Sequence, residues 1–294
     1  MQRAAEVIAR ASIVAVTCHI NPDGDALGSA LGFVAAARNA GRDAVVSFGS
    51  PFVVGGSYRF LPLAMLVPPN EFPNEPDVMV TFDVASADRL GELEAAATRA
   101  GEVIVVDHHA SNPGFGTVNL IDPAAAASAQ LAYRLILELG WPIDQVVATC
   151  LLTGLVTDTG RFQYGNTSAE TLRAAADMVE AGARPELIGR HVYEEAPFGF
   201  LGVQAAVLGR AVLEKDRSMV WSVLHASDLE RHQIGIEDTD PLIDAVRVAR
   251  EAEVAVLLKD VDGSVKASLR SRGLIDVGTV AVALGGGGHH NASG

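Results

Sequence analysis

Carboxylate and imidazole side chains gather in four short segments between residues 19 and 158. The residues are His19, Asp23 and Asp25; Asp83; Asp107, His108 and His109; and Asp158. Oxygen and imidazole nitrogen without thiolate suit Mn²⁺, with Mg²⁺, Fe²⁺ or Co²⁺ as alternatives and Zn²⁺ less favoured. Two such ions about 4 Å apart promote in-line displacement at phosphorus. These segments therefore predict metal-assisted cleavage of a phosphate ester.

The carboxylates of this set determine how many ions it needs. Four of the aspartates, gathered in one crevice, would carry negative charge that two divalent ions neutralise. We expect His19 and His108 to complete the ligand set. One carboxylate must bridge the ions, and Asp83 is the candidate because it follows a central strand alone. The four aspartates are Asp23, Asp25, Asp83 and Asp158.

A purely structural explanation suits the single residues better than the groups. An aspartate after a strand is usually a turn residue or the N-cap of the next helix. That explanation suffices for Asp83 or Asp158 taken alone. It does not suffice for the His-x3-Asp-x-Asp segment, or for adjacent histidines after an apolar strand, because burying histidines without partners is costly. The groups therefore favour a functional site.

Strand and helix patterns alternate in the first half of the chain and determine where these segments lie. Apolar, β-branched runs predict strands at 13–16, 45–48, 78–82 and 103–106. Helical patterns cover about 26–40, 91–100, 128–139 and 144–157. This alternation predicts an α/β fold with a parallel sheet and flanking helices. Three ligand segments follow strands directly, and open α/β sheets bind ligands at the carboxyl ends of their strands.

The second half predicts a smaller α/β domain, with a cleft between it and the first. A looser segment containing Pro185 and Pro197 is the expected connector. The strand patterns lie at 211–214, 219–224, 254–258 and 265–269, and the first two suggest a hairpin. The predicted bounds are 1–185 for the catalytic, metal-binding domain, 186–205 for the connector and 206–294 for the substrate-binding domain.

Candidate phosphate contacts lie near the C-terminus. Arg270 has a guanidinium able to bind a phosphate through two hydrogen bonds, although an exposed strand residue is an equally simple explanation for it. The glycines at 285–288 would let backbone N–H groups approach an anion, and a histidine follows them. The expected substrate contacts are Ser268, Arg270, Gly286, Gly287, Gly288 and His289.

Composition limits the class of protein and its partners. The chain has 294 residues, 49% hydrophobic and 20% charged, which is enough for two folded domains. Its formal net charge of −14 disfavours long nucleic acids as partners but allows a short phosphorylated substrate held with metal ions. No apolar run approaches eighteen residues, and Glu6 and Arg10 interrupt any leader-like stretch, so we expect neither a membrane span nor a signal peptide. Only two cysteines, Cys18 and Cys150, are present, which favours the cytoplasm.

The ordered motifs resemble those of the DHH phosphoesterases. The segment at 285–294, Gly-Gly-Gly-Gly-His-His-Asn-Ala-Ser-Gly, is similar to the signature of their smaller substrate-binding domain. The length points to the branch of nanoRNases and pAp phosphatases. The resemblance implies cleavage of short oligonucleotides, including pApA-type dinucleotides from cyclic di-AMP, to mononucleotides, or of pAp to AMP, and it implies a homodimer. The matching motifs are His19-Ile-Asn-Pro-Asp-Gly-Asp25, Asp83, Asp107-His-His109 and Asp158.

The resemblance also implies a role for each residue of the site. It implies two Mn²⁺ ions, for which Mg²⁺ or Co²⁺ would be substitutes. Asp107 would orient the histidines, and His109 would contact the scissile phosphate. Arg270 and His289 would hold the far end of the substrate. The two ligand sets would be His19, Asp23 and Asp83 for one ion, and Asp25, Asp83, His108 and Asp158 for the other.

Two alternative functions stay open. A manganese-dependent inorganic pyrophosphatase would use the same kind of site, but its C-terminal domain would be expected to carry clusters of lysine and arginine rather than the segment 285–289. A non-catalytic nucleotide sensor could share the fold. Such a sensor has no need of six metal ligands.

Overall fold

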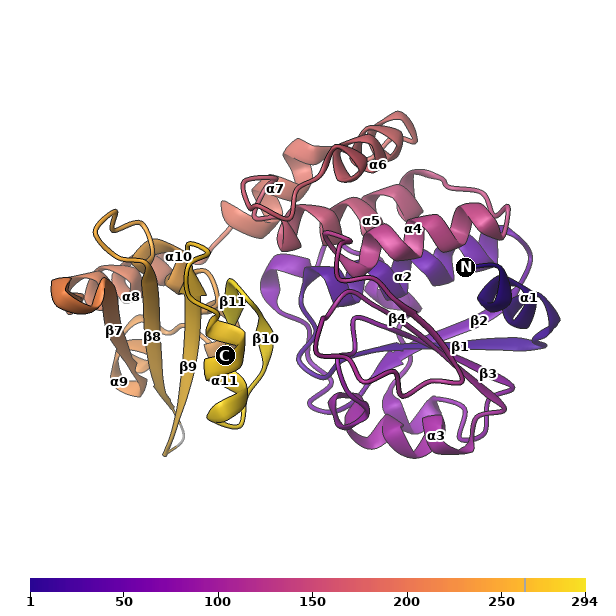
Figure 1. Ribbon diagram of the computed structural model, residues 1–294, viewed down its shortest axis with the longest axis horizontal. Coiled ribbons are helices and arrows are strands. Elements are labelled where there is room, and N and C mark those ends of the chain that lie inside the picture. The colour runs from indigo at the N-terminus through magenta and orange to yellow at the C-terminus, as the bar shows by residue number, and fades with distance from the viewer. Residues whose placement is uncertain (262) are drawn as a thin grey trace. The chain divides into compact units, whose positions relative to one another are not determined.

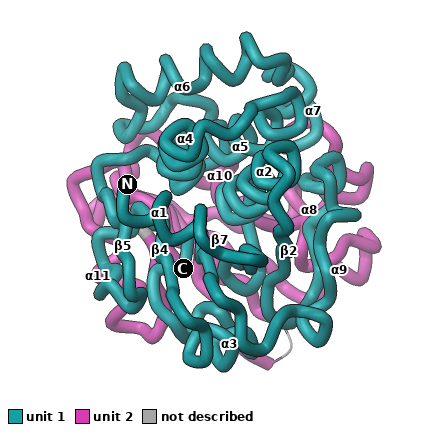
Figure 2. The backbone as a smooth tube through the Cα atoms, turned by 90° about the vertical axis from the view of Figure 1, so that its right-hand side faces the viewer, with its two compact units in different colours: residues 1–192 teal, residues 193–294 magenta. Residues whose placement is uncertain are grey.

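Two sheets, one in each half of the chain, organise the computed structural model (Figure 1). The structure describes residues 1–261 and 263–294, without the side chains of Val261 and His289. The chain divides into two units, Met1–Val192 and Tyr193–Gly294, which are drawn in different colours in Figure 2. Among the described helices, none combines the length and the apolar character needed to cross a membrane.

Unit 1 holds a five-stranded parallel sheet in the order β2-β1-β3-β4-β5. The strands are β1 (Ile13–Cys18), β2 (Asp43–Phe48), β3 (Val78–Phe82), β4 (Glu102–Asp107) and β5 (Val118–Ile121). Every residue of β3 is buried, as expected for a strand covered on both faces. The first four strands confirm the predicted ones. The pattern missed β5, a partly exposed edge strand of four residues.

Helices cover both faces of this sheet, with α2, α4 and α5 on one side and α3 on the other (Figure 1). The helices of the unit are α1 (Gln2–Arg10), α2 (Gly24–Asn39), α3 (Glu94–Arg99), α4 (Ser128–Glu138), α5 (Gln145–Asp158), α6 (Ala169–Glu180) and α7 (Pro185–Tyr193). The helix predicted at 91–100 is a 3₁₀ segment, Ala87–Leu93, followed by α3. Gly91 separates the two because its φ of +59° is not helical.

The helices α2 and α5 approach each other closely where glycine replaces a side chain. A Cβ on Gly28 of α2 would collide with the backbone carbonyl oxygen of Cys150 in α5. A Cβ on Gly24, one turn earlier, would press on the side chain of Thr157. This approach brings the start of α2 next to the end of α5, and both of these ends carry predicted metal ligands.

Unit 2 holds a six-stranded mixed sheet in the order β10-β11-β9-β8-β7-β6. The strands are β6 (Val212–Glu214), β7 (Met219–His225), β8 (Val254–Val261), β9 (Ser264–Ser271), β10 (Gly288–His289) and β11 (Ala292–Ser293). The antiparallel pair β6–β7 confirms the predicted hairpin. The helices are α8 (Phe198–Gly209), α9 (Ala226–His232), α10 (Leu242–Val246) and α11 (Val277–Ala283). Buried side chains such as Val203, Leu224 and Leu257 form its core.

The segment predicted as a looser connector is largely helical. It contains most of α7 and the first turns of α8, with the boundary between the units at residues 192 and 193. Its prolines start helices instead of interrupting them. Pro185 is the first residue of α7 and Pro197 is the N-cap of α8, positions where a missing backbone N–H costs nothing.

Candidate metal centre

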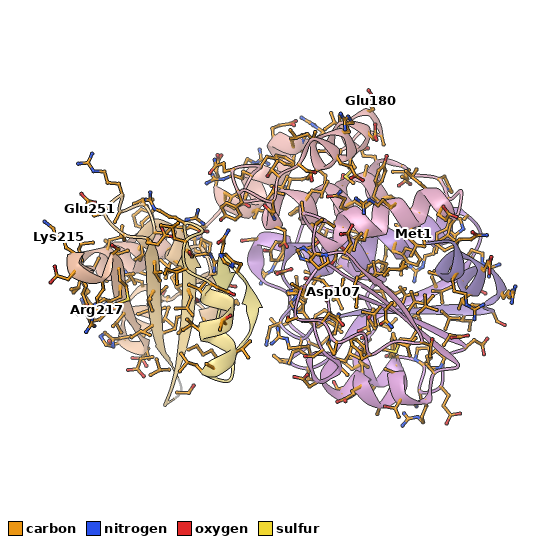
Figure 3. All side chains as sticks on the ribbon, viewed as in Figure 1. Met1, Asp107, Glu180, Lys215, Arg217 and Glu251 are labelled. Atoms are coloured by element: carbon orange, nitrogen blue, oxygen red, sulfur yellow. The ribbon has the colours of Figure 1, made fainter. Side chains whose placement is uncertain are left out.

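The predicted ligand segments meet at one edge of the unit 1 sheet. His19 follows β1, Asp83 follows β3, and Asp107 is the last residue of β4. Parallel strands end at the same edge, so these three segments are brought together by the sheet itself. Asp158, the last residue of α5, reaches the same place. Figure 3 labels Asp107 within unit 1.

A first group of ligand atoms surrounds His19. Its Nε2 lies 3.4 Å from Oδ2 of Asp83 and 3.9 Å from Oδ1 of Asp23. Asp23 is also the N-cap of α2, because its Oδ1 accepts hydrogen bonds of 3.0 Å from the backbone N–H groups of Asp25 and Ala26. The capping bonds fix the direction of the Asp23 carboxylate toward the site.

A second group surrounds His108. Its Nε2 lies 3.1 Å from Oδ2 of Asp158 and 3.8 Å from Oδ2 of Asp25. The same nitrogen lies 3.5 Å from Oδ1 of Asp83. The carboxylate of Asp83 therefore presents Oδ2 to the His19 group and Oδ1 to the His108 group. The ligand atoms lie close together in two sets, with one atom from each residue within 4.8 Å of the others in its set. The first set is His19, Asp23 and Asp83, and the second is Asp25, His108 and Asp158.

The carboxylate of Asp25 is held by the start of α4. It is fully buried and accepts hydrogen bonds from the backbone N–H groups of Ser128 (2.6 Å) and Ala129 (2.8 Å) and from Oγ of Ser29 (3.1 Å). Oγ of Ser128 also donates to Oδ1 of Asp83, at 3.1 Å. Neither serine could be predicted from the sequence, because Ser29 within α2 and Ser128 at the start of α4 have no local feature that marks them as part of a site.

The charges in this cluster shift one another's titration. Burial, and next the negative charge of Asp83, raise the pKa of Asp23 to about 6 and raise the pKa of Asp25 as well. Burial acts in the same direction on Asp83, but hydrogen bonds from His108 and His19 outweigh it and hold the pKa of Asp83 well below its ordinary value. Burial lowers the pKa of a histidine, yet the bond to Asp83 and nearby negative charge raise the pKa of His19 to about 9.

The donor set fits hard or borderline divalent cations. Oxygen and imidazole nitrogen atoms converge from four segments. Asp83 lies between the two groups, with one oxygen near His19 and the other near His108. Among the proposed ligands, the buried carboxylates of Asp25 and Asp83 also accept hydrogen bonds from hydroxyl and backbone N–H groups. These neutral donors orient a carboxylate without cancelling its charge, which leaves that charge to attract a cation.

The adjacent histidines of the Asp-His-His segment have different partners. Nδ1 of His109 lies 2.8 Å from Oδ1 of Asp107, whereas Nδ1 of His108 lies 3.3 Å from the carbonyl oxygen of Ala125. Asp107 thus orients His109, and the expectation that it also orients His108 stays a prediction. Nδ1 of His109 is also 3.6 Å from Asp83, but the shorter contact to Asp107 makes that nitrogen a hydrogen-bond donor, not a metal ligand.

The glycines among the expected substrate contacts lie in unit 2. Backbone N–H groups of Gly285, Gly286 and Gly287 donate to the carbonyl oxygens of Val282 (3.1 Å), Ala281 (2.8 Å) and Gly294 (3.0 Å) respectively. These N–H groups are thus hydrogen-bonded within unit 2, and the expected substrate contacts of Gly286, Gly287 and Gly288 stay a prediction. The turn after α11 and the pairing near the C-terminus use these N–H groups. Ser268 and Arg270 lie on β9, and the expected contact through the His289 side chain falls outside the described side chains.

Arg270 is held within unit 2. Its Nη1 donates to the carbonyl oxygen of Leu269 at 3.1 Å, and its Nε lies 3.8 Å from Oδ1 of Asp244 on α10. About a quarter of the side chain, 24%, is exposed. The guanidinium is thus partly positioned by its own unit and partly accessible to a ligand.

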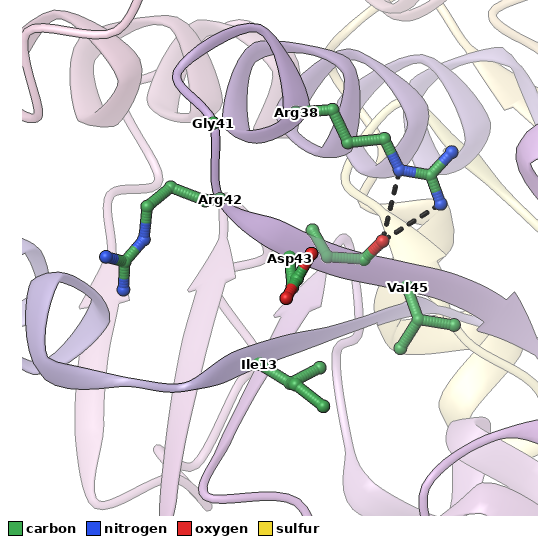
Figure 4. A pocket seen from close by; sticks show the side chains of 7 residues that line it. Ile13, Arg38, Gly41, Arg42, Asp43 and Val45 are labelled. Atoms are coloured by element: carbon green, nitrogen blue, oxygen red, sulfur yellow. Dashed lines mark hydrogen bonds between the residues drawn. The ribbon is translucent and has the colours of Figure 1, made fainter.

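A cavity of about 480 Å³ lies at the opposite end of the unit 1 sheet, beside the first residues of β1 and β2 (Figure 4). Arg38 lines it, but Nε and Nη2 of that guanidinium both donate to the carbonyl oxygen of Ala44, at 3.1 and 2.9 Å. Arg42 likewise donates to the carbonyl oxygen of Ala9, at 3.2 Å. Both arginines hydrogen-bond to backbone carbonyl oxygens, and the cavity lies at the end of the sheet opposite the metal centre.

Comparisons with known proteins agree with this arrangement. Residues 13–155 match the model of the DHH family, N-terminal domain, and residues 223–294 match that of the DHHA1 domain. The bifunctional oligoribonuclease and PAP phosphatase NrnA of Thermus thermophilus is 32% identical over 95% of this chain and 82% of its own length. The protein of the same name from Bacillus subtilis is 24% identical over 94% of this chain and 86% of its own.

A solved structure has the same fold. The crystal structure of an exopolyphosphatase-related protein from Bacteroides fragilis superposes with a TM-score of 0.91 at 24% identity, covering 99% of this chain and 88% of that one. The matches to both domain models and the identity to the Thermus thermophilus protein establish the family. The chain belongs to the DHH family of phosphoesterases, with a DHHA1 domain following its DHH domain.

Proposed function

We propose that this protein is a two-metal phosphoesterase that cleaves very short oligonucleotides, including pApA-type dinucleotides, to mononucleotides and removes phosphate from pAp. The observation that carries the proposal is the position of Asp83, whose two oxygens face the His19 and His108 groups separately. The name of the Thermus thermophilus relative, an oligoribonuclease and PAP phosphatase, supports the choice of substrates.

We assign the two groups of side chains to two ions, and we propose Mn²⁺ as the natural metal with Mg²⁺ or Co²⁺ as substitutes. When bound, such ions supply Lewis acidity toward phosphoryl oxygens. Asp83 would be shared between the ions. The proposed ligands are His19, Asp23 and Asp83 for one ion and Asp25, Asp83, His108 and Asp158 for the other.

Side chains outside the ligand sets would orient the substrate. His109 gives its Nδ1–H to Asp107, so Nε2 is the atom through which it would contact the scissile phosphate. The exposed part of the Arg270 guanidinium would bind a terminal phosphate through charge-assisted hydrogen bonds. We keep 1–185 as the proposed catalytic domain and 206–294 as the proposed substrate-binding domain, with Ser268 and His289 as further proposed contacts.

A substrate panel tests the proposal. The purified protein is stripped with a chelator, reloaded with Mn²⁺, Mg²⁺ or Co²⁺, and given pApA, oligonucleotides of increasing length, pAp and inorganic pyrophosphate. We expect mononucleotides from the shortest oligonucleotides, phosphate from pAp, and the highest rates with Mn²⁺. An Asp83→Ala preparation, purified in parallel, controls for contaminating nucleases.

Each alternative function predicts a different result. Pyrophosphate turnover above that of pApA would identify a pyrophosphatase instead. Tight binding of a dinucleotide without hydrolysis in Mn²⁺ would identify a sensor. Release of neither mononucleotide nor phosphate from any nucleotide in the panel would refute the proposal.

We also propose that the protein acts in the cytoplasm as a homodimer. Both cysteines, Cys18 and Cys150, are buried and form no disulfide, as a reducing compartment favours. The dimer is expected from the family alone. A monomer mass from light scattering would contradict it.

A further inference from the structure

Asn112 connects the two strand-end loops that carry Asp83 and Asp107. Its Nδ2 donates to Oδ2 of Asp107 at 2.6 Å and to the carbonyl oxygen of Val84 at 2.9 Å. Its Oδ1 accepts a 2.9 Å hydrogen bond from the backbone N–H of Gly114. A reversed amide would place its oxygen against two other acceptors, so this orientation is the chemically consistent one.

The position of Asn112 is itself fixed by the local turn. Its backbone N–H donates to the carbonyl oxygen of His109 at 3.1 Å, which closes a four-residue turn directly after the Asp-His-His segment. The turn folds the side chain of Asn112 back toward Asp107. The residue is partly buried.

The first consequence concerns the carboxylate of Asp107. This side chain is fully buried, and its second oxygen, Oδ1, bonds to Nδ1 of His109 at 2.8 Å. The χ2 torsion of an aspartate is broad and does not by itself fix the carboxylate plane. Asn112 supplies the missing constraint by holding Oδ2, so Oδ1 stays aimed at His109. The hydrogen bonds from Asn112 to Asp107 and from His109 to Asp107 therefore set the ring orientation of His109.

The second consequence concerns Asp83. Its φ of +59° lies in the left-handed region that residues other than glycine rarely adopt. The backbone N–H of Asp83 donates to the carbonyl oxygen of Val106 at 3.1 Å, and the carbonyl of the next residue, Val84, is the one that Asn112 holds. The unusual backbone at Asp83 is thus restrained on both sides.

We propose that Asn112 is a positioning residue for phosphate-ester cleavage, which acts by fixing the Asp107 carboxylate and the backbone after Asp83. The inference rests on the proposed function for its kinetic effect, but the orientation of His109 can be measured without any substrate. Asn112 belongs to neither proposed ligand set, and the side-chain hydrogen bonds described for it go to Asp107, Val84 and Gly114.

The test compares two variants of Asn112 with a matched control. Asn112→Asp keeps the shape and the acceptor for Gly114 but loses both donated bonds, and Asn112→Ala loses all three. The control is Asn119→Ala on β5. Asn119 also donates and accepts through its side-chain amide, but within its own segment: it accepts from the N–H of Gly116 at 3.0 Å and donates to the carbonyl oxygen of Gly116 at 2.8 Å.

We expect kcat on pApA to fall about 10–100-fold in both Asn112 variants, with KM changed less than about twofold and two ions still bound. Asn119→Ala should match the unaltered protein. If kcat in Asn112→Asp stays within about threefold of the unaltered protein, or falls only in proportion to lost metal or lost folded protein, the proposal is wrong.

A second measurement separates this proposal from the proposed function. In protein prepared without a paramagnetic metal, the Nδ1–H of His109, hydrogen-bonded to Asp107, should give an imidazole N–H resonance in the NMR spectrum that is protected from exchange with water. We expect that resonance in the unaltered protein and in Asn119→Ala, and its loss in both Asn112 variants. If the unaltered protein cleaves no nucleotide, the proposed function fails and this resonance alone decides the role of Asn112. A resonance that persists in both variants would overturn the inference.

Discussion

Replacing Gly154 by alanine tests how strictly helix packing fixes the position of Asp25. Gly154 lies in α5 and faces the start of α2. An added Cβ would lie 2.6 Å from Oδ1 of Asp25 and 2.7 Å from Cβ of Ala129. Carbon atoms in good contact are about 3.5–4.0 Å apart. The new methyl group is therefore about 1 Å too close to both neighbours, and one of them has to move.

The carboxylate is the neighbour that moves, and it moves at the expense of its hydrogen bonds. Asp25 is held by Ser29, Ser128 and Ala129, whereas Ala129 is anchored in the backbone of α4. Overpacking of this kind costs about 1–3 kcal/mol, and the better helix propensity of alanine returns about 1 kcal/mol. We therefore expect a loss of about 0–2 kcal/mol in unfolding free energy. A displacement of about 1 Å at a reacting site costs about 100-fold in rate.

The expected result for Gly154→Ala is a folded protein with about 1% of the original activity and less metal in the His108 group. Steady-state cleavage of pApA, metal analysis after gel filtration and thermal unfolding by circular dichroism measure the three quantities. Gly189→Ala in α7 is the control, because a Cβ there meets nothing within 4 Å. It should keep full activity and gain about 0.5–1 kcal/mol of stability. Activity of Gly154→Ala within about threefold of the original, with both ions bound, would refute the reasoning.

Three further predictions concern the charged residues. Asp83→Ala should abolish cleavage and reduce bound metal at both positions, whereas Asp158→Ala should disturb mainly one ion. Metal analysis that finds two ions still bound to Asp83→Ala would contradict the bridging assignment. Arg270→Ala should weaken substrate engagement about ten- to a hundredfold without changing metal content, and more on pApA than on a nitrophenyl phosphodiester. Equal losses of activity on both substrates would show that Arg270 supports the fold instead. The hydrogen bonds from Arg210, at 2.6 and 2.7 Å, hold the pKa of Asp228 below its ordinary value of 3.8. The stability that these bonds add is therefore complete above about pH 4 and is lost as the pH falls through the lower folded-state pKa of Asp228. Urea unfolding followed by tryptophan fluorescence should show that the stability of Asp228→Asn depends less steeply on acid pH. An unchanged pH dependence would argue against a stabilising Arg210–Asp228 pair.

Local sequence patterns were sufficient to predict four of the five strands of the unit 1 sheet and the edge at which its chemistry lies. Apolar runs of strand length alternate with helical patterns, and that alternation forces parallel strands whose carboxyl ends share one edge. His19, Asp83 and Asp107 follow or end such strands, so their meeting could be predicted from chain order alone. The types of these residues then indicated divalent metal ions. The short strand β5 was not predicted, because the hydrophobic periodicity of four partly exposed residues is too weak to indicate a strand.

Only the tertiary structure decided how the individual atoms are used. It turned the two oxygens of Asp83 toward different histidines, and it placed the N–H of Ser128 on Asp25 across a hundred intervening residues. It also hydrogen-bonded the N–H groups of Gly286 and Gly287 to carbonyl oxygens of the same unit, and it brought the side-chain amide of Asn112 into a hydrogen bond with Asp107. Hydrophobic periodicity records which face of an element is buried, but a hydrogen bond between distant segments depends on the packed geometry of both and leaves no local pattern in either.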